Sequence, residues 1–367
     1  MMDYRLENYQ DQWIHQVIHM DQAVCYCPEY RASKMLHDYP SRRLQLAWAV
    51  YRGELPLSDR IGEISFSSIL SRQGERWQNF RECEEDCTDV TILVREMLLE
   101  KGYQAPCVKA LHEALAAGHG RLYPEAAAWD LPLDTASDTA VLLDEETASF
   151  AADCAGAFKG LFDRKQMAFA NKAEVYYLGF EYFACGLVAE GKAHLKALIE
   201  SCQAMGVSKV LVLSAKAAYL LRTFAPKLGL QVDFEVLYLP ELMDPIPVRQ
   251  KTYVYAGSFN LRYLRNEALL NGLIPAASGE KVPESTEFTP LLQGDGRVNC
   301  LTIWQKPVGA EYETFGADGA LAEAIACDAF SDMEKAGAGQ IIVFEPTALT
   351  KIRERFPEKQ VFYYTEV

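Results

Sequence analysis

The sequence predicts a mixed α/β fold, in which a helical region is followed by two similar α/β units with parallel sheets. Three observations lead to this prediction. Helical patterns dominate residues 1–130. From residue 139 onward, short apolar runs of strand length alternate with helical patterns, which is typical of parallel sheets with helical crossovers. One strand-and-helix pattern also occurs twice along the chain.

The first region, residues 1–130, contains three clear helical patterns, and each ends at or near a glycine that suits a helix C-terminus. These helices are expected at residues 42–51, 90–101 and 108–117. The stretch 127–138 contains a proline and several aspartates, so we expect it to be a linker. The helical region is therefore predicted to end before the first strand.

The second and third regions, residues 139–245 and 250–367, are each predicted to be an α/β unit. The expected strands are residues 140–143, 175–178, 210–213, 234–239, 252–255, 301–304, 341–344 and 361–364. The expected helices are residues 191–205, 217–224, 261–270, 318–335 and 348–355. Because strands and helices alternate in both regions, each sheet is expected to be parallel.

An internal repeat relates the two α/β units. Residues 206–214 and 337–345 share a glycine followed by an apolar strand, and each segment has a helical pattern before and after it. The following helices reach Pro226 and Pro357, which keep the same 131-residue offset. The agreement of glycine, strand, helix and proline favours an origin by duplication.

The charge and the apolar runs exclude several classes of protein. The net charge is −15 and the pI is near 5.0, so the surface is expected to repel nucleic acid. Residues 1–16 lack the apolar core of a signal peptide, and no apolar run reaches the 18 residues of a membrane span. We therefore predict a cytoplasmic protein without a transmembrane segment of its own, which leaves docking on a membrane partner open.

The chain has ten cysteines, at positions 25, 27, 83, 87, 107, 154, 185, 202, 300 and 327. Without a secretory signal, a disulfide framework is not expected. Two close pairs stand out, Cys25 with Cys27 and Cys83 with Cys87. The scattered cysteines are predicted to be buried packing residues, with a residual redox or disulfide role as the alternative for Cys185 and Cys300.

Short motifs around these cysteines resemble an iron–sulfur family. Cys27-Pro28-Glu29-Tyr30 matches the C-P-x-Y end of a ferredoxin-like motif, and Cys83 and Cys87 keep the spacing of the last two cysteines of a second one. The whole chain resembles the cysteine-rich (CCG) domain family, which includes iron–sulfur proteins of anaerobic glycerol-3-phosphate dehydrogenase, glycolate oxidase and heterodisulfide reductase. The resemblance implies a ferredoxin-like helical region and two CCG-type α/β units.

The chain departs from this family at the other ligand positions of the ferredoxin-like motifs. These positions carry side chains that cannot bind iron, namely Val17, Met20, Ala23, Trp77 and Phe80. Cluster iron is held by thiolates, so neither motif retains a complete site. Large apolar side chains at such positions are expected to fill the cavity that a lost cluster would leave.

Cluster ligands are also missing where the resemblance implies them in the α/β units. In place of C-P-x-C, the chain has Ser214-Ala215-Lys216-Ala217 and Glu345-Pro346-Thr347-Ala348, and a third ligand segment corresponds to Ala256-Gly257-Ser258-Phe259. The C-C-G motifs are at best echoed by Ala184-Cys185-Gly186 and Asn299-Cys300-Leu301. The chemistry of the family's clusters would need the missing thiolates.

Cys25, Cys27, Cys83 and Cys87 are the candidate metal-binding residues. If the fold brings them together, four thiolates could bind zinc tetrahedrally or retain part of an iron–sulfur site. The spacing C-x-C followed by C-x3-C is not that of a standard zinc ribbon. The sequence therefore favours a protein without a cofactor, with an iron–sulfur cluster or zinc as the alternative, and it indicates no catalytic residue.

Ligand loss within a retained architecture predicts a non-catalytic or scaffold subunit of a flavin and iron–sulfur oxidoreductase complex. The resemblance implies a flavin-containing dehydrogenase subunit or other redox subunits as partners. The alternative is an electron-transfer oxidoreductase subunit that keeps a cofactor at the N-terminal cysteines. A third hypothesis is a small-molecule or enzymatic site between the two α/β units, lined by Ser214, Ser258 and Glu345.

Overall fold

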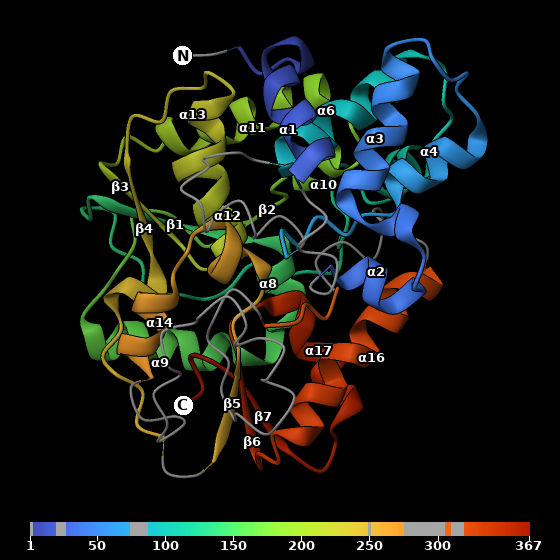
Figure 1. The fold of residues 1–367 in the computed structure, drawn as a ribbon. Coiled ribbons are helices and arrows are strands. Elements are labelled where there is room, and N and C mark those ends of the chain that lie inside the picture. The colour runs from blue at the N-terminus through green and yellow to red at the C-terminus, as the bar shows by residue number, and fades with distance from the viewer. Residues whose placement is uncertain (1–2, 20–26, 74–86, 249–250, 275–304, 310–318) are drawn as a thin grey trace.

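The computed structural model describes residues 3–19, 27–73, 87–248, 251–274, 305–309 and 319–367. The described residues form a mixed α/β fold with two parallel sheets, as predicted (Figure 1). Helices of the N-terminal region pack beside the first sheet, and the second sheet lies at the opposite end of the molecule from the N-terminus (Figure 1).

The N-terminal region is helical throughout its described part. Its helices are α1 (Gln10–His19), α2 (Pro28–Ser33), α3 (Pro40–Tyr51), α4 (Asp59–Phe66), α6 (Cys87–Glu100) and α7 (Pro106–Ala117). A proline at the first position starts α2, α3 and α7, where its fixed φ and missing N–H suit a helix N-terminus. The three helices that the sequence predicted here, α3, α6 and α7, are confirmed.

The first sheet has the order β2-β1-β3-β4, with every strand pair parallel. Its strands are β1 (Thr139–Asp144), β2 (Val175–Tyr176), β3 (Lys209–Val212) and β4 (Glu235–Tyr238). Successive residues of β3 alternate between two core clusters, because Val210 and Val212 face one core and Leu211 faces the other. Burial on both faces explains why this strand is a continuous apolar run in the sequence.

The second sheet repeats this plan with the order β5-β6-β7, again parallel. Its strands are β5 (Thr252–Tyr255), β6 (Gln340–Val343) and β7 (Gln360–Tyr363), while the strand predicted at residues 301–304 lies outside the described residues. The order β1-β3-β4 corresponds to β5-β6-β7. The central strands β3 and β6 begin 131 residues apart, at Lys209 and Gln340, as duplication would produce.

Helices cover both sheets and complete the two units. They are α8 (Glu145–Phe150), α9 (Ala155–Lys165), α10 (Phe180–Ala184), α11 (Val188–Gln203), α12 (Ala215–Tyr219), α13 (Ala225–Lys227), α14 (Glu267–Leu273), α16 (Gly319–Lys335) and α17 (Pro346–Arg355). Helices α8, α9 and α10 were not predicted from the sequence. Each of these helices lies beside a strand or a loop with a short apolar run. The spacing of the apolar residues in the helix could therefore not be distinguished from that of the neighbouring segment.

The prediction of one continuous helix at residues 261–270 is wrong. The chain forms a π-helical turn, Phe259–Tyr263, and then α14. Arg265 has φ +56°, a left-handed conformation that an α-helix cannot contain, and it separates the two segments. The helix predicted at residues 217–224 is likewise divided into α12 and a second π-helical turn, Leu220–Phe224.

The helical region packs directly against both α/β units. Helix α2 lies beside α16 (Figure 1), where Arg31 and Asp328 form an ion pair with an N–O distance of 2.7 Å. One core cluster joins the helical region to the first sheet, and a second joins the first sheet to the second. The expected boundaries between the three regions stay predictions. No helix of the described part is long and apolar enough to cross a membrane.

Candidate functional site

The carboxyl ends of strands β3, β5 and β6 bring together three segments at which the sequence resemblance implied cluster ligands. Ser214 follows β3, Glu345 follows β6, and Ser258 follows β5. All three side chains are buried, with at most 1% of their surface exposed. In parallel α/β sheets this edge is the usual place for a ligand site, so its contents are the first test of function.

Lys216 is the central side chain of this edge, and it is 1% exposed. Its ammonium donates to Glu146 Oε1 at 2.5 Å and to Glu181 Oε1 at 3.2 Å. Glu146 comes from α8 and Glu181 from α10, so the cluster ties two helices to α12. Burial opposes the charge on Lys216, but Glu146, Glu181 and Glu345 together raise its pKa well above the usual range.

The carboxylates around Lys216 outnumber the single ammonium. Burial raises the pKa of Glu146 to about 8, and the neighbouring charges of Glu181 and Asp144 add to the shift, while Lys216 opposes it. Burial also raises the pKa of Asp144, although Asp144 accepts two hydrogen bonds from Thr147 at 2.9 Å. Lys216 is therefore the single cation shared by Glu146 and Glu181.

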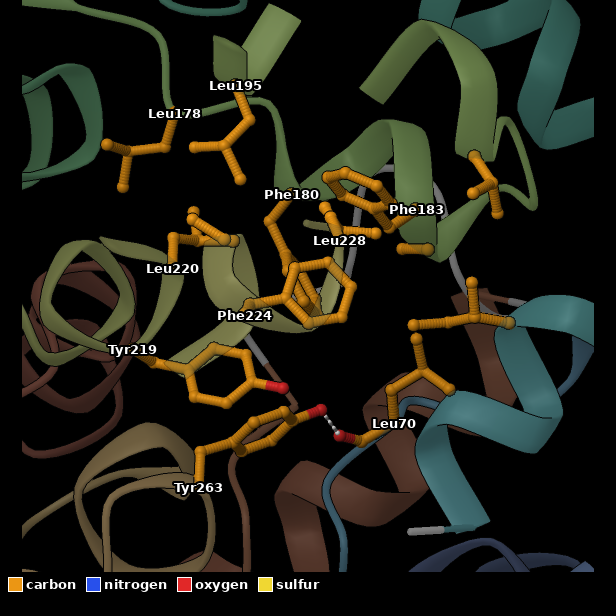
Figure 2. Close-up of a cluster of buried hydrophobic side chains, with 14 of the residues drawn as sticks. Leu70, Leu178, Phe180, Phe183, Leu195, Tyr219, Leu220, Phe224, Leu228 and Tyr263 are labelled. Atoms are coloured by element: carbon orange, nitrogen blue, oxygen red, sulfur yellow. Dashed lines mark hydrogen bonds between the residues drawn. The ribbon is translucent and has the colours of Figure 1, made fainter. Parts of the chain in front are cut away.

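Aromatic rings fill the space beside this charge cluster. The ring centroids of Phe259 and Tyr263 are 4.5 Å apart, and those of Tyr219 and Tyr263 are 4.8 Å apart. Figure 2 shows Tyr219 and Tyr263 next to each other, with the Tyr263 hydroxyl donating to the Leu70 carbonyl at 2.5 Å. The Lys216 ammonium lies 5.6 Å from the Phe259 ring centroid. The edge is thus filled with packed side chains.

Ser214, Ser258 and Glu345 were expected to line a polar pocket at this edge. Their polar groups instead form hydrogen bonds within the protein or pack against neighbouring residues. Ser214 caps α12 by accepting a hydrogen bond from the Ala217 amide at 3.3 Å, and Ser258 accepts one from Arg262 at 2.6 Å. Glu345 lies against Gly257, where an added Cβ would come within 2.8 Å of Glu345 Oε2. These contacts fix the edge internally and do not support the small-molecule hypothesis.

Two of the four candidate metal-binding cysteines, Cys25 and Cys83, lie outside the described residues. Cys27 is fully buried, and its thiol donates to Glu29 Oε2 at 3.0 Å. Burial and the Glu29 charge raise the pKa of Cys27 well above the usual range, whereas metal binding requires the thiolate. Cys87 begins α6 and packs in a core cluster to which Cys27 does not belong. The four-cysteine site stays a prediction.

A group that the sequence did not indicate consists of Asp153, Cys154 and Glu366, whose possible ligand atoms lie within 4.8 Å of one another. Arg353 already occupies both carboxylates, with N–O distances of 2.8 Å to Asp153 and 3.0 Å to Glu366. Burial raises the pKa of Cys154, which keeps it protonated. A metal ion would have to displace the guanidinium, so this group fits an ion pair better than a metal site.

A pocket of about 740 Å³ lies between α2, α4 and α7 of the helical region and α16 of the second α/β unit. Its polar side is formed by Arg60, which lies 3.0 Å from His37 Nε2 and 3.0 Å from Glu63 Oε2. Its other side includes Tyr103 and Cys107. The volume is that of a typical small-molecule site. Because its residues come from four separate helices, the sequence carried no signal for it.

Comparison of the chain with known protein families, with curated proteins and with solved structures finds no match. The proposed function therefore depends on the sites described above and on the motifs found in the sequence.

Proposed function

We propose that the chain is a non-catalytic scaffold subunit of a flavin and iron–sulfur oxidoreductase complex. In this role it keeps the architecture of a CCG-type electron-transfer protein and carries no cluster between its α/β units. The observation that carries the proposal is Lys216, a buried cation within the segment that corresponds to a C-P-x-C ligand motif.

The chemistry around Lys216 is unsuited to an iron–sulfur cluster. A cluster needs thiolate ligands and adds negative charge, whereas the described residues of Lys216's cluster include no cysteine and place Glu146, Glu181 and Glu345 around one ammonium. The space beside the ammonium is taken by Phe180 and Phe259, whose ring centroids are 5.2 Å apart. Neither charge nor volume favours a cluster.

The retained architecture supports a structural role toward partners. Both sheets keep their parallel order, and their connection to the helical region is fixed by buried contacts such as Tyr263 with Leu70. The expected partners are a flavin-containing dehydrogenase subunit or other redox subunits. With a net charge of −15, this chain would favour a partner surface that is positively charged.

The alternative, an electron carrier with a cofactor at the N-terminal cysteines, makes a different prediction. It requires Cys27 and Cys87 as thiolates beside Cys25 and Cys83. The protonated state of Cys27 in its contact with Glu29 weighs against this alternative. If this alternative is correct, replacing Cys83 and Cys87 by serine removes a measurable cofactor.

The test is to isolate the tagged full chain from its native cells without oxygen and to measure flavin and subunit stoichiometry in the assembly by native mass spectrometry. The scaffold role predicts a flavoprotein in a fixed ratio to this chain. It also predicts that the separated chain gives no iron–sulfur signal in low-temperature electron paramagnetic resonance. A chain isolated without any redox partner would contradict the proposal. An iron–sulfur signal abolished in Cys83→Ser/Cys87→Ser would establish the electron carrier instead.

A further inference from the structure

Two cysteines outside the expected sites form a close pair. Cys107, on α7, packs against the core cluster that contains Cys185, directly after α10, and both are free thiols. Cys185 is fully buried, whereas Cys107 is partly exposed and lines the 740 Å³ pocket. One thiol of the pair is therefore reachable from the pocket, and the other lies behind it.

The start of α7 favours a thiolate at Cys107. Cys107 follows Pro106, the first residue of the 12-residue helix, and the N-cap residue Ala105 has no side chain that could cap the first turn. The amides of the first turn therefore have no side-chain cap at this end of the helix. Amide donors and the helix dipole at this position both stabilise negative charge.

Arg95 supplies a second source of positive charge, independent of the helix. Its side chain is fully buried, and its guanidinium donates to the backbone carbonyls of Ala184 at 2.6 Å, Ser68 at 2.8 Å and Ser65 at 3.3 Å. In the described part of the chain, all of these acceptors are neutral. A buried guanidinium bonded only to neutral groups favours a nearby anion, and the electrostatic partner that acts on it most strongly is Cys107.

These contacts separate the acidities of the two thiols. The neighbouring Cys185 thiol, the charge of Arg95 and the start of the helix lower the pKa of Cys107 and outweigh the effect of burial. The contact with Cys107, followed by burial, raises the pKa of Cys185. Cys107 thus has the properties of an attacking thiolate, and Cys185 those of a second thiol held ready beside it.

We propose that Cys107 and Cys185 form a redox-active dithiol that exchanges with a low-molecular-weight disulfide bound in the pocket between α2, α4, α7 and α16. This activity goes beyond the scaffold function and does not rest on it. The pocket offers the rings of Phe66 and Tyr103 for the apolar part of the substrate. Arg60, which is paired with Glu63, could bind a carboxylate of the substrate by exchanging that partner.

The exchange balances without any further reactant. The Cys107 thiolate attacks one sulfur of the disulfide R–S–S–R, so that a Cys107–S–S–R bond forms, the substrate S–S bond breaks and RS⁻ leaves. Cys185 then gives up its proton and attacks the Cys107 sulfur, and the second RS group leaves and takes that proton as RSH. Two protein thiols are oxidised to one disulfide, and one substrate disulfide is reduced to two thiols.

Two other cysteines provide internal controls because their exposure and acidity differ from those of Cys107. Cys327 is exposed, but partial desolvation of its thiol and the neighbouring charge of Glu323 raise its pKa. Cys202 is buried, and burial raises its pKa to about 11. If accessibility alone governs reactivity, Cys327 reacts first, whereas a stabilised thiolate makes Cys107 react first.

The experiment uses the reduced full chain, treated with oxidised glutathione at pH 7 and analysed by peptide mass mapping. The wild-type chain is expected to form a Cys107–Cys185 disulfide without a lasting adduct. Cys185→Ala is expected to stop at one glutathione adduct on Cys107, and Cys107→Ser to form neither product. Cys327→Ser serves as the matched control and should behave like the wild type.

Alkylation rates with iodoacetamide give a second measurement that needs no variant. Cys107 should react faster than Cys327, by about threefold for each unit of difference between their pKa values, because the tenfold gain in thiolate is partly offset by lower nucleophilicity. Faster alkylation of Cys327, or a glutathione adduct on Cys327 while Cys107 stays reduced, would overturn the proposal. So would a Cys185→Ala chain, shown to be folded by circular dichroism, that forms no adduct on Cys107.

Discussion

Lys216 is the residue on which the buried ion cluster at the carboxyl ends of the strands depends. A buried ion cluster gains little net stability, because desolvation of the charges offsets their attraction, and apolar residues of similar size often do as well. Removing only one partner is different, since the remaining carboxylates would stay buried without a cation. Lys216 is therefore expected to be essential to the fold for as long as Glu146 and Glu181 are present.

Replacement of Lys216 by methionine tests this expectation. Lys216→Met should lower the free energy of unfolding by about 3 kcal/mol, because it leaves Glu146 and Glu181 without their shared cation. Adding Glu181→Gln should restore part of the loss. Lys109→Met is the control, since Lys109 forms only an exposed pair with Glu113 and should change stability by less than about 0.5 kcal/mol. Urea unfolding measures all three, and equal effects of the two lysine variants would refute the account.

The raised glutamate pKa values predict how stability depends on pH. Burial raises the pKa of Glu96 and Glu145 to about 7 and that of Glu146 to about 8. Between about pH 4.5 and these values, the folded chain binds more protons than the unfolded chain, so the free energy of unfolding falls as pH rises. The stabilisation of the folded chain by these protonated carboxyl groups is complete below their unfolded pKa, and it is lost as the pH rises through about 8.

Thermal unfolding measured from pH 5.5 to pH 8.5 checks this sign. The melting temperature should be higher at pH 5.5, and Glu146→Gln should reduce the difference because it removes one titrating group. A melting temperature that stays constant or increases over this interval would show that these carboxyl groups are ionised in the folded chain.

At the scale of elements, the contact of α2 with α16 joins the helical region to the second α/β unit. Arg31 binds Asp328 through two hydrogen bonds of 2.7 and 3.0 Å, and Lys306 donates to both Asp328 and Asp332 at 2.9 Å. Although burial opposes it, hydrogen bonds from Arg31 and Lys306 lower the pKa of Asp328. The paired geometry makes this contact stronger than an isolated surface ion pair.

A double-mutant cycle on Arg31→Ala and Asp328→Ala measures that contact. We expect a coupling free energy of about 1 kcal/mol, because the pair is bidentate and about one third exposed. The exposed pair of Arg60 and Glu63, three residues apart on α4, is the control and should give less than about 0.5 kcal/mol. Equal coupling in the two cycles would mean that the α2–α16 contact contributes nothing beyond a surface pair.

The sequence predicted most of these elements because their patterns are local. Strand β5 and the helices α3, α6 and α7 have clear periodicity, and prolines or glycines mark their ends. The π-helical turns at 220–224 and 259–263 were not predictable in this way. Their apolar spacing resembles that of an α-helix, and tertiary packing of Tyr219, Phe259 and Tyr263 at the shared edge accompanies the local change.

The sites were less predictable than the elements, because they join residues that are far apart in the chain. Motif spacing drew attention to Ser214, Ser258 and Glu345, and the structure places all three at the strand ends. The motif spacing gave no indication that Lys216 would contact Glu146 and Glu181, because helices α8 and α10 were not predicted. The pairing of Cys107 with Cys185 likewise needed the packing of α7 against the residues around α10.

At the scale of the whole molecule, the two sheets share one strand order but differ in their surroundings. The first sheet is buried between two core clusters, while the second belongs to one of them. The shared edge holds an ion cluster and packed rings. The central claim of the proposed function is that the molecule offers partners a surface while the positions to which the resemblance assigns ligands hold packed side chains.

The most direct measurement of that claim is iron, zinc and acid-labile sulfide per chain, on protein purified without oxygen and without a metal-affinity column. The scaffold account predicts a folded, colourless chain without stoichiometric iron or sulfide. Zinc alone would indicate a structural site at Cys25, Cys27, Cys83 and Cys87 and leave the claim about the α/β edge intact. Iron and sulfide in near-stoichiometric amounts would contradict the account and show that the chain still carries electrons.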